Sequence, residues 1–221
     1  EHNLSISGGT EKLQYVLSGS FLDQKGLLRH GTDKFQRYTL NSKITANITD
    51  WLKVTLNSKW TREDFQRPTY LTSSFFHNLA RKWPVHPAYD PNGFPMDEGE
   101  IEQMENGGEQ NSQKDYYTNQ LHVVIEPIKN WRINLEGSVR TTTQYQHWEV
   151  LPVHAYDVNG DPYYTVWDMG YGSYSAGSSR VDEYSWKENY YTTNIYSDYF
   201  KQFDNGHYFK VMAGFNAELY K

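Results

Sequence analysis

The sequence contains no cysteine, no long hydrophobic run and no excess of basic residues. Without cysteine, neither a disulfide framework nor a thiolate metal site can form. No run approaches the roughly 18 apolar residues that indicate a membrane-spanning helix, so none is predicted. The formal net charge is −6. That balance gives no support to nucleic-acid binding, which needs a basic face, and no nucleic-acid partner is expected.

Aromatic residues, by contrast, are abundant. They make up 16% of the chain, with 19 Tyr and 7 Trp, while the mean hydropathy is −0.83. A chain that is rich in aromatic residues yet hydrophilic on average fits a membrane barrel, whose strands are half polar and whose loops are long.

The stretch 35–66 predicts two strands joined by a tight turn at 49–51. Alternate side chains along a strand point to opposite faces, and here one set is apolar and the other polar. Helical spacing fits neither half. The apolar set includes Leu40, Ile44, Ile48, Val54 and Leu56, and the polar set includes Arg37, Lys43, Lys53 and Lys59.

The length of this pattern favours a membrane over a soluble sheet. The ten steps from Tyr38 to Ile48 span roughly 33 Å at a rise of about 3.3 Å. Tilted, they cover the lipid-facing band of about 25 Å of an outer-membrane barrel, whereas soluble strands usually stop at about 5–6 residues. Tyr38 and Trp60 lie near one end of the stripe and Trp51 near the other, as in interfacial girdles.

These positions predict which side chains meet lipid and which meet water. We expect the five apolar residues named above to face lipid and the four cations to face the lumen. In the lumen, the cations could line a solute path, contact a plug domain or simply form part of a water-filled polar wall, and the sequence leaves these alternatives open.

Further alternating segments predict an all-β, antiparallel transmembrane barrel segment of about eight strands. The connections are, in order, short, moderate, short, long, short, long and short, with the long loops at about 67–115 and 146–189. Outer-membrane barrels likewise have short turns on one side of the membrane and longer loops on the other. A short helix is expected from Ser73 to Trp83, ending before Pro84. Because both ends of the chain fall on strands next to the long-loop side, eight strands of a larger barrel explain the pattern better than a small closed one.

Four segments of the sequence then resemble a known family: 2–12 (HNLSISGGTEK), 21–26 (FLDQKG), 32–38 (TDKFQRY) and 47–54 (NITDWLKV). They are similar to the SusC/RagA-like TonB-dependent transporters of Bacteroidetes outer membranes. The specific part of the resemblance covers residues 1–67. Beyond it, only the rhythm of strands and loops agrees.

The resemblance implies a barrel of about 22 strands around an N-terminal plug, capped by a SusD-like surface lipoprotein. It implies import of glycans or oligosaccharides, or of peptides, driven by the TonB complex through the plug. No plug, TonB-contacting segment or final barrel strand is recognisable. We therefore expect the chain to be an excerpt, and the transport function to belong to the complete protein. No cofactor is implied.

The long loops are crowded with aromatic side chains. Flat rings with a polar edge suit stacking on sugars and also suit protein interfaces. Packing within the loops, an interface with a lid protein and direct contact with substrate all remain open. The candidate residues are Trp83, Tyr89, Trp148, Tyr163, Tyr164 and Trp167.

Two loop segments, 83–93 and 151–160, echo one another. In the second, Asp157, Asn159 and Asp161 show the alternate-residue oxygen spacing of a calcium loop. However, Pro162 occupies the position where an EF-hand needs glycine, and Asp-x-Asn-Gly forms tight turns for conformational reasons alone. We expect small loop hairpins and no bound metal.

Two other functions are compatible with parts of the sequence. A soluble β-sandwich could bind carbohydrate through its loops, and a glycan-cleaving enzyme could use a loop carboxylate such as Glu100. The acidic run 97–109 is more typical of a solvated loop, so no enzyme is expected. A second sheet packed on Leu40, Ile44, Val54 and Leu56 would exclude the transporter.

Overall fold

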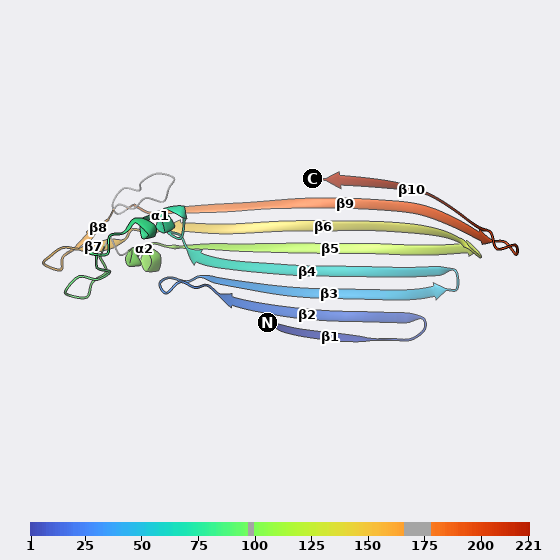
Figure 1. The fold of residues 1–221 in the computed structure, drawn as a ribbon, viewed down its shortest axis with the longest axis horizontal. Coiled ribbons are helices and arrows are strands. Elements are labelled where there is room, and N and C mark those ends of the chain that lie inside the picture. Colours follow the sequence, from blue (N-terminus) through green and yellow to red (C-terminus); the bar gives the residue numbers. More distant parts are fainter. Residues whose placement is uncertain (97–99, 166–177) are drawn as a thin grey trace.

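The computed structural model describes residues 1–96, 100–165 and 178–221. Its main body is one antiparallel sheet of eight strands in the order β1-β2-β3-β4-β5-β6-β9-β10, so each large strand pairs with the next along the chain. Figure 1 shows these strands side by side in a single layer, with tight turns at one end and both helices at the other.

The strands are long. They run over His2–Gly9 (β1), Leu13–Lys25 (β2), Lys34–Thr49 (β3), Leu52–Pro68 (β4), Glu109–Ile128 (β5), Trp131–Val150 (β6), Arg180–Gln202 (β9) and Tyr208–Tyr220 (β10). With 23 residues, β9 is about four times the usual length of a strand in a globular protein. The hairpin predicted at 35–66 is confirmed as β3 and β4.

The loop end carries the smaller elements. Helix α1 spans Ser73–Arg81 and α2 spans Ile101–Asn106, while β7 (His154–Tyr156) and β8 (Pro162–Tyr164) form a separate two-stranded hairpin. The helix predicted before Pro84 is confirmed, although it ends at Arg81. Neither helix within the described ranges has the length and apolar character needed to cross a membrane.

The pairing register places apolar residues of neighbouring strands next to one another. Ile44 pairs with Leu56 and Leu56 with Leu121, and one row further on Val54 pairs with Val123 and Val123 with Leu135. Because side chains alternate, these rows form one continuous surface, the apolar face, and the cations occupy the opposite polar face. The apolar face includes Leu4, Ile6, Leu17, Leu40, Ile44, Val54, Leu56, Leu121, Val123, Leu135, Val139, Ile195 and Phe215.

No second layer covers the apolar face within the described residues. Leu40, Ile44 and Leu56 are 55%, 37% and 42% exposed, and Val54 is half-buried. The only cluster of buried hydrophobic side chains among these residues lies instead at the loop end. A β-sandwich requires two facing sheets, so the sandwich hypothesis is wrong.

The predicted loop boundaries, 67–115 and 146–189, are wrong by several residues. The structure continues β5 back to Glu109 and β6 on to Val150, and β9 begins at Arg180. Residues 109–115 are polar on both faces, so the alternation disappears although the backbone ladder with β4 and β6 continues. Helix α2 was also missed, because its six residues are too few to show a helical period.

Candidate functional site

Aromatic side chains mark both ends of the apolar face. Towards the loops, the rings of Trp60 and Tyr117 lie 6.4 Å apart on neighbouring strands. Near the tight turns, Trp51 is half exposed, and the indole of Trp131 donates a hydrogen bond to Ser197 Oγ at 2.8 Å. Rings with an apolar body and a polar edge are typical of the two boundaries of a lipid bilayer.

A charged pair lies immediately beyond the aromatic boundary at the loop end. Arg62 donates from Nε and Nη2 to the two carboxylate oxygens of Asp115, at 2.9 and 2.8 Å, and Trp60 Nε1 donates to Asp115 at 3.0 Å. Asp115 is only 7% exposed. The ladder β3–β4–β5 pairs Tyr38 with Arg62 and Arg62 with Asp115, on the same face as Leu40. The apolar face thus ends at this level.

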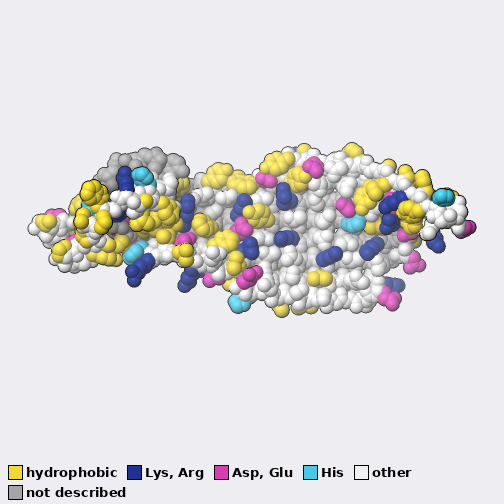
Figure 2. Space-filling view, in the orientation of Figure 1, with side chains coloured by type: hydrophobic (Ala, Val, Ile, Leu, Met, Phe, Trp, Pro, Cys, Tyr) yellow, Lys and Arg dark blue, Asp and Glu magenta, His cyan; other side chains and the backbone are white. Residues whose placement is uncertain are grey.

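The four predicted lumen residues all lie on the polar face. Arg37, Lys43, Lys53 and Lys59 stand across the β3–β4 ladder from Glu63, Asn57, Asn47 and Asn41. None of the four cations forms an ion pair within the described residues. In Figure 2, dark-blue cations are spread over a largely white sheet surface, and the densest group of yellow side chains lies at the loop end.

Two of these cations border a recess on the polar face. The recess has a volume of about 470 Å³. It is lined by Arg37, Lys59 and Arg140 of β6, and also by Glu63 and Tyr116. Tyr116 donates a hydrogen bond to Glu63 at 3.3 Å, and the Arg140 guanidinium lies 5.1 Å from the ring centre of Tyr190. This recess carries more positive than negative charge, so it is suited to anionic groups.

A small hydrophobic cluster holds the loops together. Tyr70, Phe75, Met104, Val150 and Val153 form its buried centre. These residues come from α1, α2, the end of β6 and the segments between them, so the cluster joins the two long loops to the sheet. This is the only place in the described residues where elements distant in sequence share a hydrophobic core.

The predicted loop aromatics divide into two groups. Trp83 is 71% exposed, and Tyr89, Tyr163 and Tyr164 are about half exposed, which leaves their rings accessible. Trp148 is different. It lies within β6 and packs against the hydrophobic cluster. Its assignment to a loop was therefore wrong, because the strand continues beyond the point where apolar and polar residues stop alternating. Trp167 lies outside the described residues.

The two echoing loop segments form a packed pair. Asp90 Oδ1 accepts backbone N–H bonds from Asn92 and Phe94, and a Tyr89–Pro95 bridge closes that hairpin. The β7–β8 hairpin repeats the arrangement around Asp157. The Phe94 ring from the first hairpin stacks on Tyr156 of the second, with centroids 4.2 Å apart and planes inclined by 19°. The sequence predicts both turns but not the contact between them, of which the repeated motif is the one local sign.

The carboxylate of Asp157 is occupied by its own turn. Asp157 Oδ1 accepts backbone N–H bonds from Asn159 at 2.8 Å and from Asp161 at 2.9 Å. These bonds, led by the one from Asp161, lower the pKa of Asp157 because they stabilise the charged form. In the chain apart from 97–99 and 166–177, no group of three or more metal-ligating side chains comes together.

Acidification should loosen this turn. The pKa of Asp157 is lower in the folded state than in the unfolded state. Its carboxylate therefore stabilises the turn fully above the unfolded-state pKa of about 3.9, and this stabilisation is lost as the pH falls through the folded-state pKa. We expect the amides of Asn159 and Asp161 to lose protection from hydrogen exchange in that window, after correction for intrinsic rates. Asp157→Asn should remove the pH dependence. Unchanged protection across that window would contradict the assignment.

The stacked rings should couple the two loops energetically. A double-mutant cycle with Phe94→Ala and Tyr156→Ala should give about 0.5–1.5 kcal/mol of coupling, the usual value for an aromatic pair. Local stability can be followed by the rate at which a protease cuts the loops of the folded protein. A control cycle combines Phe94→Ala with Tyr163→Ala. Tyr163 makes no ring contact with Phe94, so this cycle should show no coupling.

Glu100, the candidate carboxylate of a glycan-cleaving enzyme, is buried. Its Oε1 accepts a hydrogen bond from the Tyr70 hydroxyl at 3.2 Å and lies 3.5 Å from Lys82 Nζ. A catalytic acid must be able to reach its substrate, whereas these contacts tie Glu100 into the packing beneath the loops. The structure therefore disfavours this hypothesis.

A single antiparallel sheet with one apolar and one polar face, tight turns at one end and long loops at the other is the architecture of a segment of a large β-barrel. Solved structures with this fold exist. Three of them are described as the RagAB peptide importer in its 'open-open' state, the same importer in its 'closed-closed' state, and the RagAB peptide transporter.

The matches to these structures are close in shape and distant in sequence. The TM-scores are 0.76, 0.74 and 0.71 in that order, with 18%, 17% and 17% identity. Each match covers 99% of this chain and 24% of the other, so this chain spans about a quarter of the length of those proteins. No protein-family model and no curated protein sequence matches the chain. At this identity the likeness establishes the fold.

Proposed function

We propose that the chain is part of the wall of a TonB-dependent importer in the outer membrane, of the SusC/RagA type. The observation that carries this proposal is the apolar face, which extends across the sheet with no second layer among the described residues. In water, such a surface would be a large aggregation liability. In a bilayer, it is the surface that a barrel presents to lipid.

In this proposal, one face of the sheet contacts lipid and the other contacts water. Leu40, Ile44, Ile48, Val54 and Leu56 contact acyl chains, and the rings of Trp60, Tyr117 and Trp51 lie at the two bilayer boundaries. The polar face borders the aqueous interior. Its cations, Arg37, Lys43, Lys53 and Lys59, line the path of the solute.

The loop end then lies outside the cell. The exposed rings of Tyr89, Tyr163 and Tyr164 belong to the stacked pair of hairpins, and the exposed ring of Trp83 lies in the segment before the first of them. We propose that they form part of the contact with a SusD-like lid lipoprotein, because exposed aromatic side chains on a firm base are typical of protein interfaces. The TonB complex would act through a plug elsewhere in the complete protein.

The proposed cargo is an oligomeric nutrient, either a peptide or an oligosaccharide. The loop rings suit both, because an aromatic face stacks on a sugar and also on apolar side chains. The similar solved structures are described as a peptide importer, so peptides are the first class to test. Glycans, which the sequence resemblance placed first, are the second.

The proposal can be tested by uptake in cells that produce the complete protein. Fluorescent oligopeptides and fluorescent oligosaccharides are supplied separately, and accumulation is compared with a strain that lacks the gene. Import of one class should depend on the gene and should stop when the proton-motive force is dissipated. Recovery of the protein from buffer without detergent, as a monodisperse monomer, would contradict the proposal at its first step.

A further inference from the structure

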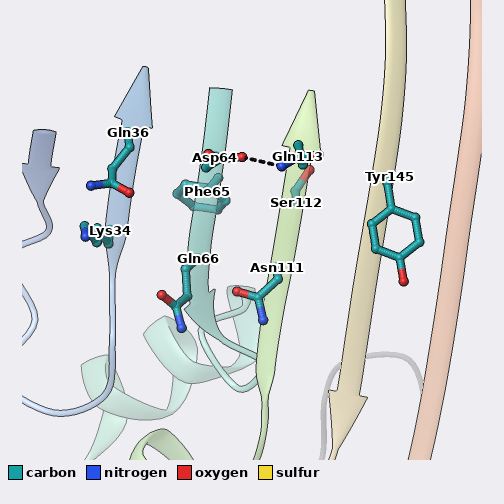
Figure 3. A pocket seen from close by; sticks show the side chains of 9 residues that line it. All are labelled: Lys34, Gln36, Asp64, Phe65, Gln66, Asn111, Ser112, Gln113 and Tyr145. Carbon is teal, nitrogen blue, oxygen red and sulfur yellow. Dashed lines mark hydrogen bonds between the residues drawn. The ribbon is translucent and has the colours of Figure 1, made fainter. Parts of the chain in front are cut away.

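A pocket rich in carboxamides lies beyond the apolar face, towards the loops. It has a volume of about 450 Å³, and its lining includes Gln36, Gln66, Asn111, Gln113 and Tyr145 from four neighbouring strands. Figure 3 shows these side chains around the open space, with Gln113 bonded to Asp64. Nothing in the proposed import function uses this pocket.

The spacing along the strands fixes the face on which the pocket opens. Gln36 precedes Leu40 by four residues, Asp64 follows Trp60 by four, and Gln113 precedes Tyr117 by four. An even number of residues keeps a side chain on the same face of a strand. The pocket therefore opens on the same side as the apolar face, roughly 13 Å beyond the aromatic boundary along the strands.

The carboxamides are held in fixed orientations. Gln36 Nε2 donates to Asp23 at 2.9 Å, Gln66 Nε2 to Glu109 at 2.6 Å, and Gln113 Nε2 to Asp64 at 3.0 Å. The Oε1 atoms of these three glutamines accept no hydrogen bond within the described residues. Each amide thus keeps an acceptor, and its second N–H donor, for a ligand.

The remaining lining suits a sugar. Asn111 is exposed and makes no side-chain hydrogen bond within the described part of the chain, so both its donor and its acceptor are available. The Tyr145 ring is 46% exposed, while its hydroxyl is held by Glu183 at 3.0 Å. Paired donors and acceptors match adjacent hydroxyl groups, and an aromatic face matches the C–H surface of a pyranose ring.

We propose that this pocket binds the sugar headgroup of a glycolipid in the outer leaflet of the membrane. The inference rests on the proposed function, because it needs the apolar face to lie in lipid. A headgroup whose acyl chains lie against Leu40 and Trp60 would reach the level of Gln36 and Gln113. A solute crossing on the polar face would be on the wrong side of the sheet.

Charge favours a neutral sugar over a phosphate. Three carboxylates accept hydrogen bonds from the glutamines of the pocket: Asp64, which is itself part of the lining, and Asp23 and Glu109. The one cation in the lining, Lys34, is 3.7 Å from the carboxylate of Asp23. An anionic group would meet net negative charge here, so any phosphate on the glycolipid must lie outside the pocket, whereas sugar hydroxyl groups can donate to the free carbonyl oxygens.

The test uses the complete protein in nanodiscs of phosphatidylethanolamine, with and without lipopolysaccharide from the producing strain. Two variants weaken the pocket, Gln66→Ala/Gln113→Ala and the milder Asn111→Ala, which removes no hydrogen bond of the fold. The matched control is Asn57→Ala/Gln120→Ala. It removes two carboxamides, themselves hydrogen-bonded at 3.3 Å, from the polar face of the same two strands.

We expect the parent protein to retain lipopolysaccharide through detergent extraction, as measured by native mass spectrometry. Retention should fall about tenfold in the double variant and less in Asn111→Ala, as expected for the loss of a few hydrogen bonds. The control should retain as much as the parent. The oligosaccharide released from the same lipopolysaccharide by mild acid should bind far more weakly, because it lacks the lipid anchor.

Two results would overturn the inference. One is a parent protein that lies in the membrane and imports its cargo but retains no lipopolysaccharide. The other is a double variant that retains as much as the parent. Either leaves the proposed function intact. A parent protein that does not enter the membrane at all would overturn both proposals, so the two failures are distinguishable.

Discussion

Leu56→Arg is expected to destabilise the complete protein in its membrane by about 2–4 kcal/mol, the cost of an arginine on the lipid face near the bilayer midplane. Leu56 pairs with Ile44 on one side and with Leu121 on the other, and it lies on β4 midway between Trp51, in the preceding turn, and Trp60. The guanidinium would have no water and no partner carboxylate at this level, so the full cost of its desolvation would appear.

The matched variant is Asn57→Arg, one residue along the same strand and on the polar face. It should change the free energy of unfolding by about 1 kcal/mol at most, because a charge in the lumen remains hydrated and water weakens its repulsion by Lys43 across the ladder. Both values can be measured by reversible denaturant unfolding in lipid vesicles. If both substitutions cost the same, the apolar face does not lie in lipid, and the proposed function is wrong at its basis.

Asp115→Ala is expected to cost about 2–3 kcal/mol, because it leaves a guanidinium and an indole N–H without their acceptor. Asp115 is 7% exposed and accepts bonds from Arg62 and from Trp60. The estimate stays below that for a fully buried pair, since the side chain of Arg62 is 34% exposed and water partly solvates it.

The comparison for this variant is Asp182→Ala. Asp182 pairs with Arg180 at 2.7 Å, but both side chains are well exposed, at 40% and 56%. Exposed pairs of this kind usually contribute less than about 1 kcal/mol. Unfolding of the complete protein in lipid should separate the two variants clearly. Equal effects would mean that Asp115 is not an anchor of the boundary between the apolar face and the loops.

Both expectations depend on which residues share a face, and the sequence predicts this well where one face is apolar. From Leu40 to Leu56, the alternation alone identified the strands, their turn and their two sides. It failed where both faces become polar. Around Gln113 and Gln146 the strands continue although the alternation has ended, and the predicted loops were therefore too long.

The loop end was the least predictable part. Trp148 was assigned to a loop, whereas it belongs to β6 and packs on the hydrophobic cluster. Glu100 belongs to an acidic run whose composition is typical of a solvated loop, yet Tyr70 and Lys82 hold it in a buried position. Both outcomes depend on partners distant in the sequence, and no local pattern carries that information.

What the sequence determined by itself is a two-sided, all-β chain with long strands, tight turns at one end and long loops at the other. A residue's face depends only on whether its position is odd or even along the strand, so this much is local. The tertiary structure decided what lies side by side across strands: the continuous apolar face, the Phe94–Tyr156 stack and the carboxamide pocket. These depend on the pairing register of the strands and on the contact between two loops. Both are determined by residues that are far apart in the chain.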